Sequence, residues 1–158
     1  MENEISKTTP VGTKKIRDFI FAVGRRRAAV ARVRLYSKVP SGLKFGENDI
    51  KKGTMLVNEK NIESYFSGAV SKAEYEKPLK IVNASGKYGV TARIVGGGPK
   101  SQLGAFVLGL SRALATVDGE NRPLLRKKGL LTRDARVRER RKVGMGGKAR
   151  RKRQSPKR

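Results

Sequence analysis

The sequence contains no cysteine, no histidine and no tryptophan. Without cysteine, disulfide bonds, thiolate zinc sites and cysteine nucleophiles are excluded. Without histidine, the commonest general base and the commonest metal ligand are missing. Acidic residues are also scarce, at 13 against 38 lysines and arginines, and they lie beside lysines in polar segments, as on a charge-balanced surface. We therefore expect no enzymatic activity, no catalytic residue, no metal ion and no cofactor.

Long hydrophobic runs are absent as well. Hydrophobic residues make up 37% of the chain, and no run approaches the roughly 20 apolar residues of a transmembrane helix. Residues 1–4 carry two glutamates and no apolar core, so they are unlike a secretory signal or an acid-poor transit peptide. With a formal net charge of +25, the sequence indicates a cytoplasmic protein with an anionic partner, and neither a membrane nor a small-molecule substrate.

The positive charge is concentrated near the C-terminus. Residues 122–158 hold 17 basic and 2 acidic side chains, whereas residues 1–121 hold 21 and 11. Apolar residues become rare across the same boundary, so this segment has too little apolar surface to offset its ordering entropy and self-repulsion. We expect a flexible N-terminal extension at 1–18, a globular domain at 19–129 and an extended basic tail at 130–158.

Alternating apolar residues predict strands in the globular part. Residues 29–36 and 88–94 show the period of two that is typical of a half-buried strand. Shorter strands are expected at 43–45 and 55–57. The strand over 29–36 places Arg32 and Arg34 on the face opposite its apolar residues.

Helices are expected between and after these strands. Asn58 is a candidate N-cap for a short helix that includes Ile62 and Tyr65, and Pro78 is expected to end a second one over 72–77. Leucines and valines spaced by three and four residues over 103–117 predict the main helix. A last helix is expected from Pro123 to Gly129. The fold class is therefore α+β, a single sheet backed by helices.

The glycine run at residues 96–98 resembles a phosphate-binding loop only superficially. The run is followed by Pro99 and Lys100, so the GxxxxGK[ST] spacing is missing. Pro99 also lacks the N–H that a phosphate cradle would use. A strand-to-helix turn is the better interpretation, with amides that could still contact one RNA phosphate.

Clustered basic residues are the strongest functional signal. A set of five arginines with no acid among them is better explained by phosphate contacts than by charge protection of a strand edge; it comprises Arg25, Arg26, Arg27, Arg32 and Arg34. The C-terminal set favours RNA backbone binding over a nonspecific solubility or localisation tail; it comprises Arg126, Lys127, Lys128, Arg133, Arg136, Arg138, Arg140, Arg141, Lys142, Lys148, Arg150, Arg151, Lys152 and Arg153. Asp134 and Glu139 are candidates for ion pairs that fix an arginine.

Several segments resemble, in order, one known family: protein nine of the small ribosomal subunit, in its bacterial or organellar form. The resemblance lies in residues 23–27, 30–33, 57–66, 77–79, 96–114, 124–144, 148–151 and 157–158. It implies a fold similar to the second domain of small-subunit protein five. It also implies binding to the 3′ major domain of the small-subunit ribosomal RNA, beside neighbouring proteins of the subunit head.

In that family the end of the tail reaches the anticodon stem-loop of transfer RNA in the peptidyl site. By position, the resemblance implies that Lys157 and Arg158, with Ser155 and Gln154, are the tRNA contacts. Bacterial members often end in Pro-Gln-Phe-Ser-Lys-Arg, whereas this chain ends in Arg-Gln-Ser-Pro-Lys-Arg, so the charge is kept and the aromatic residue is lost.

Two other functional classes remain as alternatives. A free, sequence-tolerant nucleic-acid-binding protein, such as an architectural DNA protein or an RNA chaperone, would show the same charge. An RNA-processing enzyme is less well supported, because no cluster of acids offers a metal site.

Overall fold

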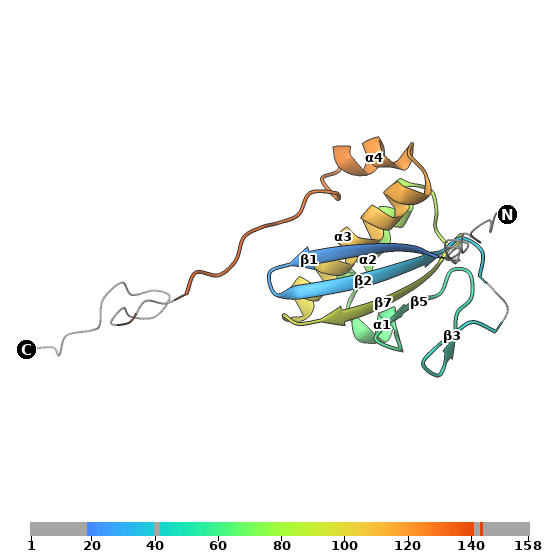
Figure 1. Cartoon of the computed structure of the whole chain (residues 1–158), viewed down its shortest axis with the longest axis horizontal. Helices are drawn as coiled ribbons and strands as arrows, with labels where there is room; N and C mark the ends of the chain where they lie inside the picture. Colours follow the sequence, from blue (N-terminus) through green and yellow to red (C-terminus); the bar gives the residue numbers. More distant parts are fainter. Residues whose placement is uncertain (1–18, 40–41, 141–142, 144–158) are drawn as a thin grey trace, which may run out of the picture.

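The computed structural model of the chain describes residues 19–39, 42–140 and 143. Its centre is a five-stranded sheet in the order β1-β2-β7-β5-β6, in which β5 and β7 are parallel and the other neighbours antiparallel (Figure 1). The strands are β1 (Ile20–Arg26), β2 (Ala29–Tyr36), β5 (Met55–Val57), β6 (Lys60–Asn61) and β7 (Gly89–Val95), with β3 (Lys44–Phe45) and β4 (Asn48–Asp49) in a separate hairpin. The helices are α1 (Ile62–Tyr65), α2 (Ala69–Ile81), α3 (Pro99–Val117) and α4 (Asn121–Lys127). The predicted α+β class, a single main sheet with helices, is confirmed.

The hairpin of β1 and β2 forms one edge of the main sheet. β2 confirms the predicted strand over 29–36, but β1 is missing from the sequence prediction. The inward side of β1 includes Ala22 and Gly24, which are too small to mark an apolar face in the sequence. As a consequence, Arg25 and Arg26 belong to a strand rather than to a segment upstream of one.

The main helix α3 covers β1 and β2 on one face of the sheet. It confirms the helix predicted from the apolar stripe over 103–117. Its buried surface is wider than that stripe, because Ala105, Phe106 and Ala113 are fully buried as well. α2 packs against α3 from the side, so one continuous core lies between the sheet and the helices.

The backbones of α3 and β1 approach each other closely at two glycines. A Cβ atom on Gly24 would collide with the backbone of Ala105 and Gly109, and one on Gly109 would lie 2.8 Å from a methyl group of Val33. Gly109 lowers the intrinsic helix propensity of α3, so the packing that it permits must compensate for this cost.

Asn58 is not the N-cap that the sequence suggests. The cap of α1 is Asn61, whose side chain accepts a hydrogen bond from the N–H of Glu63 at 3.2 Å. Asn58 lies in the turn between β5 and β6 with a φ of 46°, and its side chain bonds both the N–H (2.8 Å) and the C=O (3.0 Å) of Ile94. Asparagine tolerates the left-handed region, and here it ties this turn to β7.

Pro78 does not end a helix, contrary to the sequence prediction. α2 continues through it from Ala69 to Ile81. A proline inside a helix costs about 3 kcal/mol, and burial of Tyr75, Pro78 and Leu79 against the core offsets that cost. The expectation failed because tertiary packing outweighed the local rule.

The last helix follows the prediction closely. α4 spans Asn121–Lys127, with Pro123 in its first turn, and Gly129 follows at a φ of 71°. The N–H of Leu130 donates to the carbonyl of Leu125 at 3.1 Å, which closes the helix end. The side-chain amide of Asn121 donates to the carbonyl of Leu114 at 3.3 Å and attaches α4 to α3.

A second, smaller apolar cluster lies on the opposite face of the sheet. Tyr36, Ile50 and Leu56 are buried there, with Leu43 and Phe45 packed against them. The strand predicted at 43–45 thus appears as β3 and covers one end of that face. Within the described ranges, no helix is both long and apolar enough to cross a membrane.

Substituting Gly24 by alanine is expected to destabilise the protein by about 1–3 kcal/mol, because the added methyl group would force α3 away from β1. Urea unfolding measures this change. The matched control is Gly119→Ala, since Gly119 has open space around its Cβ position and no positive φ. Equal stability of the two variants would contradict the close approach.

Candidate nucleic-acid interface

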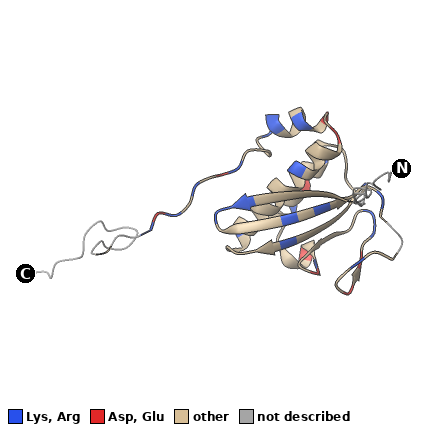
Figure 2. Cartoon of the chain, in the orientation of Figure 1, with Lys and Arg blue, Asp and Glu red and all other residues tan. Residues whose placement is uncertain are grey.

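The face of the sheet that points away from α3 carries a band of arginines. Arg32 lies opposite Val23 on β1 and opposite Arg93 on β7, while Arg34 lies opposite Phe21. Residues directly opposite in a sheet point to the same side, and Figure 2 shows the basic residues as blue bands across the strands. The arginine face consists of Phe21, Val23, Arg25, Val30, Arg32, Arg34, Arg93 and Val95.

Aromatic rings from outside the main sheet hold two of these arginines. The guanidinium carbon of Arg34 lies 5.0 Å from the ring centroid of Phe19, and that of Arg93 lies 5.9 Å from that of Phe45. Cation–π contacts of this kind are worth about 0.5–1 kcal/mol at exposed sites. Glu59 also reaches Arg93, at 3.6 Å. The two arginines are therefore positioned before any partner binds.

The structure separates the three consecutive arginines at 25–27. Arg25 is exposed on the arginine face, whereas Arg26 points to the helix side, where it contacts Gly104 of α3. Arg27 occupies the turn between β1 and β2 with a φ of 52°. A non-glycine residue in this region is strained, so the tip of the hairpin presents an arginine at some cost in stability. The predicted cluster of five is thus divided between two faces and a turn.

The glycine turn after β7 offers few donors for a phosphate. Gly96 and Gly97 have positive φ angles, and a Cβ on Gly96 would lie 2.5 Å from the carbonyl oxygen of Ala28. The N–H groups of Ser101 and Gln102 both donate to the carbonyl of Gly98 at 2.9 Å. With Pro99 lacking an N–H, the turn fits the interpretation as a connection that packs against the β1–β2 hairpin.

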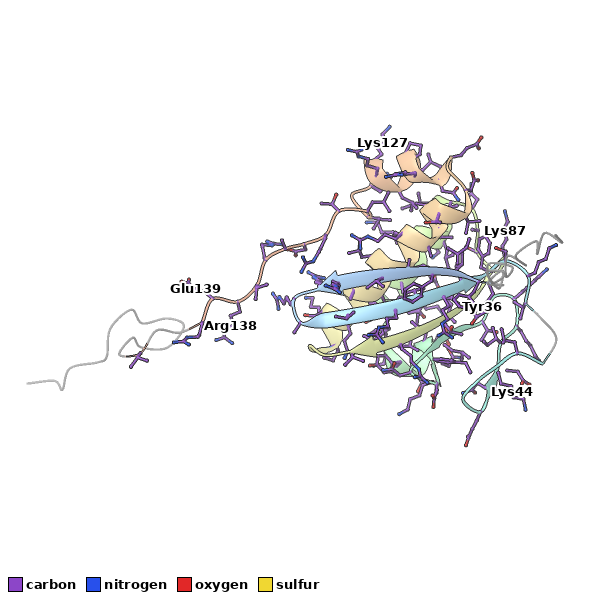
Figure 3. The ribbon with its side chains drawn as sticks, in the orientation of Figure 1. Tyr36, Lys44, Lys87, Lys127, Arg138 and Glu139 are labelled. Atoms are coloured by element: carbon purple, nitrogen blue, oxygen red, sulfur yellow. The ribbon has the colours of Figure 1, made fainter. Side chains whose placement is uncertain are left out.

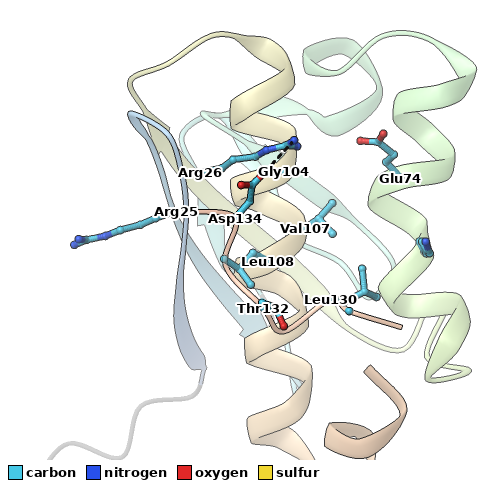
Figure 4. A pocket seen from close by; sticks show the side chains of 11 residues that line it. Arg25, Arg26, Glu74, Gly104, Val107, Leu108, Leu130, Thr132 and Asp134 are labelled. Atoms are coloured by element: carbon cyan, nitrogen blue, oxygen red, sulfur yellow. Dashed lines mark ion pairs between the residues drawn. The ribbon is translucent and has the colours of Figure 1, made fainter. Parts of the chain in front are cut away.

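Asp134 attaches the start of the basic tail to the domain. Its carboxylate accepts hydrogen bonds from the guanidinium of Arg136 at 3.0 Å and lies 3.7 Å from Arg26 (Figure 4). The hydrogen bonds from the side chain and backbone of Arg136 lower the pKa of Asp134 to about 2. The hypothesis that Asp134 pairs with an arginine is confirmed; for Glu139, no ion pair is recorded among the described residues.

Beside this contact lies an open cavity of about 310 Å³, lined by residues of α2, α3 and the start of the tail (Figure 4). Side chains of both charges line it: Arg25, Arg26 and Lys77 on one hand, Glu74 and Asp134 on the other. Because two carboxylates offset most of the positive charge, the lining favours a phosphate less than the arginine face does.

The remaining described basic residues of the C-terminal set are exposed. Lys127 lies on α4 and Arg138 lies further along the tail, away from the sheet (Figure 3). The exposed set comprises Arg126, Lys127, Lys128, Arg133, Arg136, Arg138 and Arg140. The other candidates lie outside the described residues: Arg141, Lys142, Lys148, Arg150, Arg151, Lys152, Arg153, Gln154, Ser155, Lys157 and Arg158.

Arg93 and Phe21 were not among the functional residues expected from the sequence. The period of two over 88–94 predicts that Arg93 lies on the face away from the apolar residues of its strand. Its position beside Arg32 could not be predicted in this way, because it depends on the pairing of β7 with β2. In the part of the chain that the structure describes, no three acidic side chains gather into a possible metal site.

The carboxyl of Asp134 is expected to titrate with a pKa of about 2, below its ordinary 3.8. Because the folded pKa is depressed, the contact with the arginines is present above about pH 4 and lost as the pH falls toward 2. An NMR titration of the Asp134 carboxyl carbon measures this. Arg136→Gln should move the midpoint of this titration back toward 3.8 more than Arg26→Gln does, since Arg136 makes the hydrogen bonds to the carboxylate. An unchanged midpoint in Arg136→Gln would contradict the assignment of the lowered pKa to Arg136.

Comparison with known proteins agrees with the resemblance seen in the sequence. The family model described as ribosomal protein S9/S16 matches residues 24–158. The small ribosomal subunit protein uS9 of Leifsonia xyli subsp. xyli (strain CTCB07) is 45% identical over 125 residues, which are 78% of this chain and 67% of that protein. The uS9 proteins of Arthrobacter sp. (strain FB24) and Renibacterium salmoninarum are 44% identical over the same shares. The expected family is therefore confirmed: the chain belongs to the ribosomal protein S9/S16 family.

Proposed function

We propose that the chain is a structural constituent of the small ribosomal subunit that binds ribosomal RNA and acts without catalysis. Membership of the S9/S16 family supports the ribosomal role, as do relatives that are named small ribosomal subunit protein uS9. The observation that carries RNA binding is the arginine face, where four exposed arginines lie on three neighbouring strands and only Arg93 has an acidic partner, Glu59, among the described residues.

The arrangement of the arginine face suits contacts to the RNA backbone. Guanidinium groups bind phosphate oxygens through paired hydrogen bonds and are weakly hydrated. The core on the other face keeps β1, β2 and β7 in fixed register, so the arginines keep their spacing. Such contacts position a protein on RNA without reading its sequence.

The tail at 130–158 extends this interface beyond the domain at 19–129. Its described basic residues are exposed, and 29 extended residues can span on the order of 100 Å. We infer that it lies between RNA segments of the 3′ major domain, beside neighbouring proteins of the subunit head, on a cytoplasmic ribosome. The family also supports a fold similar to the second domain of small-subunit protein five.

Sedimentation of a native lysate at high salt tests the proposal. Many phosphate contacts within a folded RNA should keep the chain with small subunits, whereas nonspecific binders with 6–10 phosphate contacts lose about 10³–10⁵ in affinity between 50 and 200 mM salt. Mass spectrometry of the gradient fractions locates the chain. Its appearance at the top of the gradient would favour a free nucleic-acid-binding protein instead.

The tip of the tail is proposed to hold transfer RNA in the peptidyl site through Lys157 and Arg158. Deleting residues 155–158 should weaken tRNA retention by about tenfold or more, because each charge-assisted hydrogen bond contributes roughly 1.5–3 kcal/mol, and should leave subunit assembly intact. Filter binding of tRNA to purified subunits at matched salt measures retention. A Pro156→Gly variant, which keeps both charges, is the control. Equal retention by truncated and complete subunits would rule out this role.

A further inference from the structure

The arginine face contains an exposed aromatic ring that phosphate binding does not explain. Phe21 keeps 44% of its surface exposed, and no other phenylalanine or tyrosine among the described residues is classed as exposed. Val95, on the same face, is 71% exposed. Alternating apolar and cationic side chains thus cover this side of the sheet, rather than charge alone.

The neighbours of Phe21 are arranged so that its ring stays uncovered. Its partner in register is Arg34, whose guanidinium lies over the ring of Phe19. The cluster of Tyr36, Ile50 and Leu56 lies toward the same end of this face, but Phe19, and not Phe21, packs against it. An exposed flat ring beside arginines is the arrangement on which nucleic-acid bases stack.

The charges beside Phe21 also indicate an anionic occupant. Arg32 and Arg93 lie directly opposite each other on β2 and β7, and like charges at such positions are destabilising. Glu59 reaches only Arg93, at 3.6 Å, and no acidic partner for Arg32 is recorded in the described part of the chain. A phosphate between the two guanidinium groups would relieve their repulsion.

We propose that the arginine face binds an unpaired stretch of RNA, with one base stacked on Phe21 and an adjacent phosphate held by Arg32 and Arg93. A duplex is a poorer fit, because its base faces are stacked internally and only its backbone is accessible. Phe21 and Arg93 are two strands apart and offset by two residues along the strand, roughly 12 Å at the usual strand spacing and rise, so a short stretch of RNA reaches both. This inference rests on the proposed RNA-binding function and adds a preference for unpaired nucleotides.

The experiment uses the complete chain and a single-stranded oligoribonucleotide that contains 5-iodouridine. Ultraviolet crosslinking followed by mass spectrometry should place the adduct on Phe21. Phe21→Leu should lose the adduct and bind the single strand about tenfold more weakly, while Phe21→Tyr keeps both properties. Val70→Ala is the matched control, because it removes an exposed apolar side chain from α2, outside the arginine face. Binding to a duplex of the same sequence should not depend on Phe21.

Each outcome decides a different point. If Phe21→Leu binds the single strand like the wild type while Arg32→Gln with Arg93→Gln weakens binding, stacking is refuted and the proposed function stands. If neither change affects binding to RNA, the arginine face has no role in the proposed function either. All variants share the tail, so its contribution cancels. The thermal midpoint of each variant shows whether it is folded. If the leucine variant does not fold, the tyrosine variant still tests the proposal, because it must keep both the adduct and the affinity for the single strand.

Discussion

At Gly24 and Gly109 the backbones of β1 and α3 come so close that neither residue has room for a side chain. This contact fixes which face of the hairpin lies against the helix. Because successive residues of a strand alternate between faces, the same contact places Arg25, Arg32 and Arg34 on the opposite side. A shift of one residue in the strand pairing would bury the arginines and expose the core residues. The packing of α3 against β1 therefore also determines on which face the arginines lie.

The two faces of the sheet therefore have opposite requirements. Against α3, fully buried residues such as Val33, Leu35 and Phe106 supply the stability. On the arginine face, Arg32 and Arg93 repel each other across the strands, and at the hairpin tip Arg27 adopts a strained backbone conformation. Costs of this kind persist where function requires them and the remaining structure supports them. The protein retains these costs on the surface that we assign to RNA.

The sequence predicted those elements whose pattern is carried by large side chains. The alternation over 29–36 and the stripe over 103–117 are of this kind, and both were confirmed. β1 was missed because Ala22 and Gly24 form its inward side, and Pro78 was misjudged because its cost is met by contacts distant in sequence. The arginine face was half predicted: Arg32 and Arg34 follow from local alternation, whereas Arg93 joins them only through the pairing of β7 with β2.

The two basic parts of the chain leave the β1–β2 hairpin on different sides. The arginine face lies on the side away from α3, while Asp134 attaches the start of the tail to Arg26 on the helix side. One RNA segment lying on the sheet would therefore be separated from a second segment along the tail by the thickness of the hairpin. In the proposed function, the domain is then a rigid spacer between two RNA segments, and the Asp134–Arg26 contact sets the direction in which the tail leaves it. Under that proposal, the arginine face and the basic residues of the tail would contact different RNA segments.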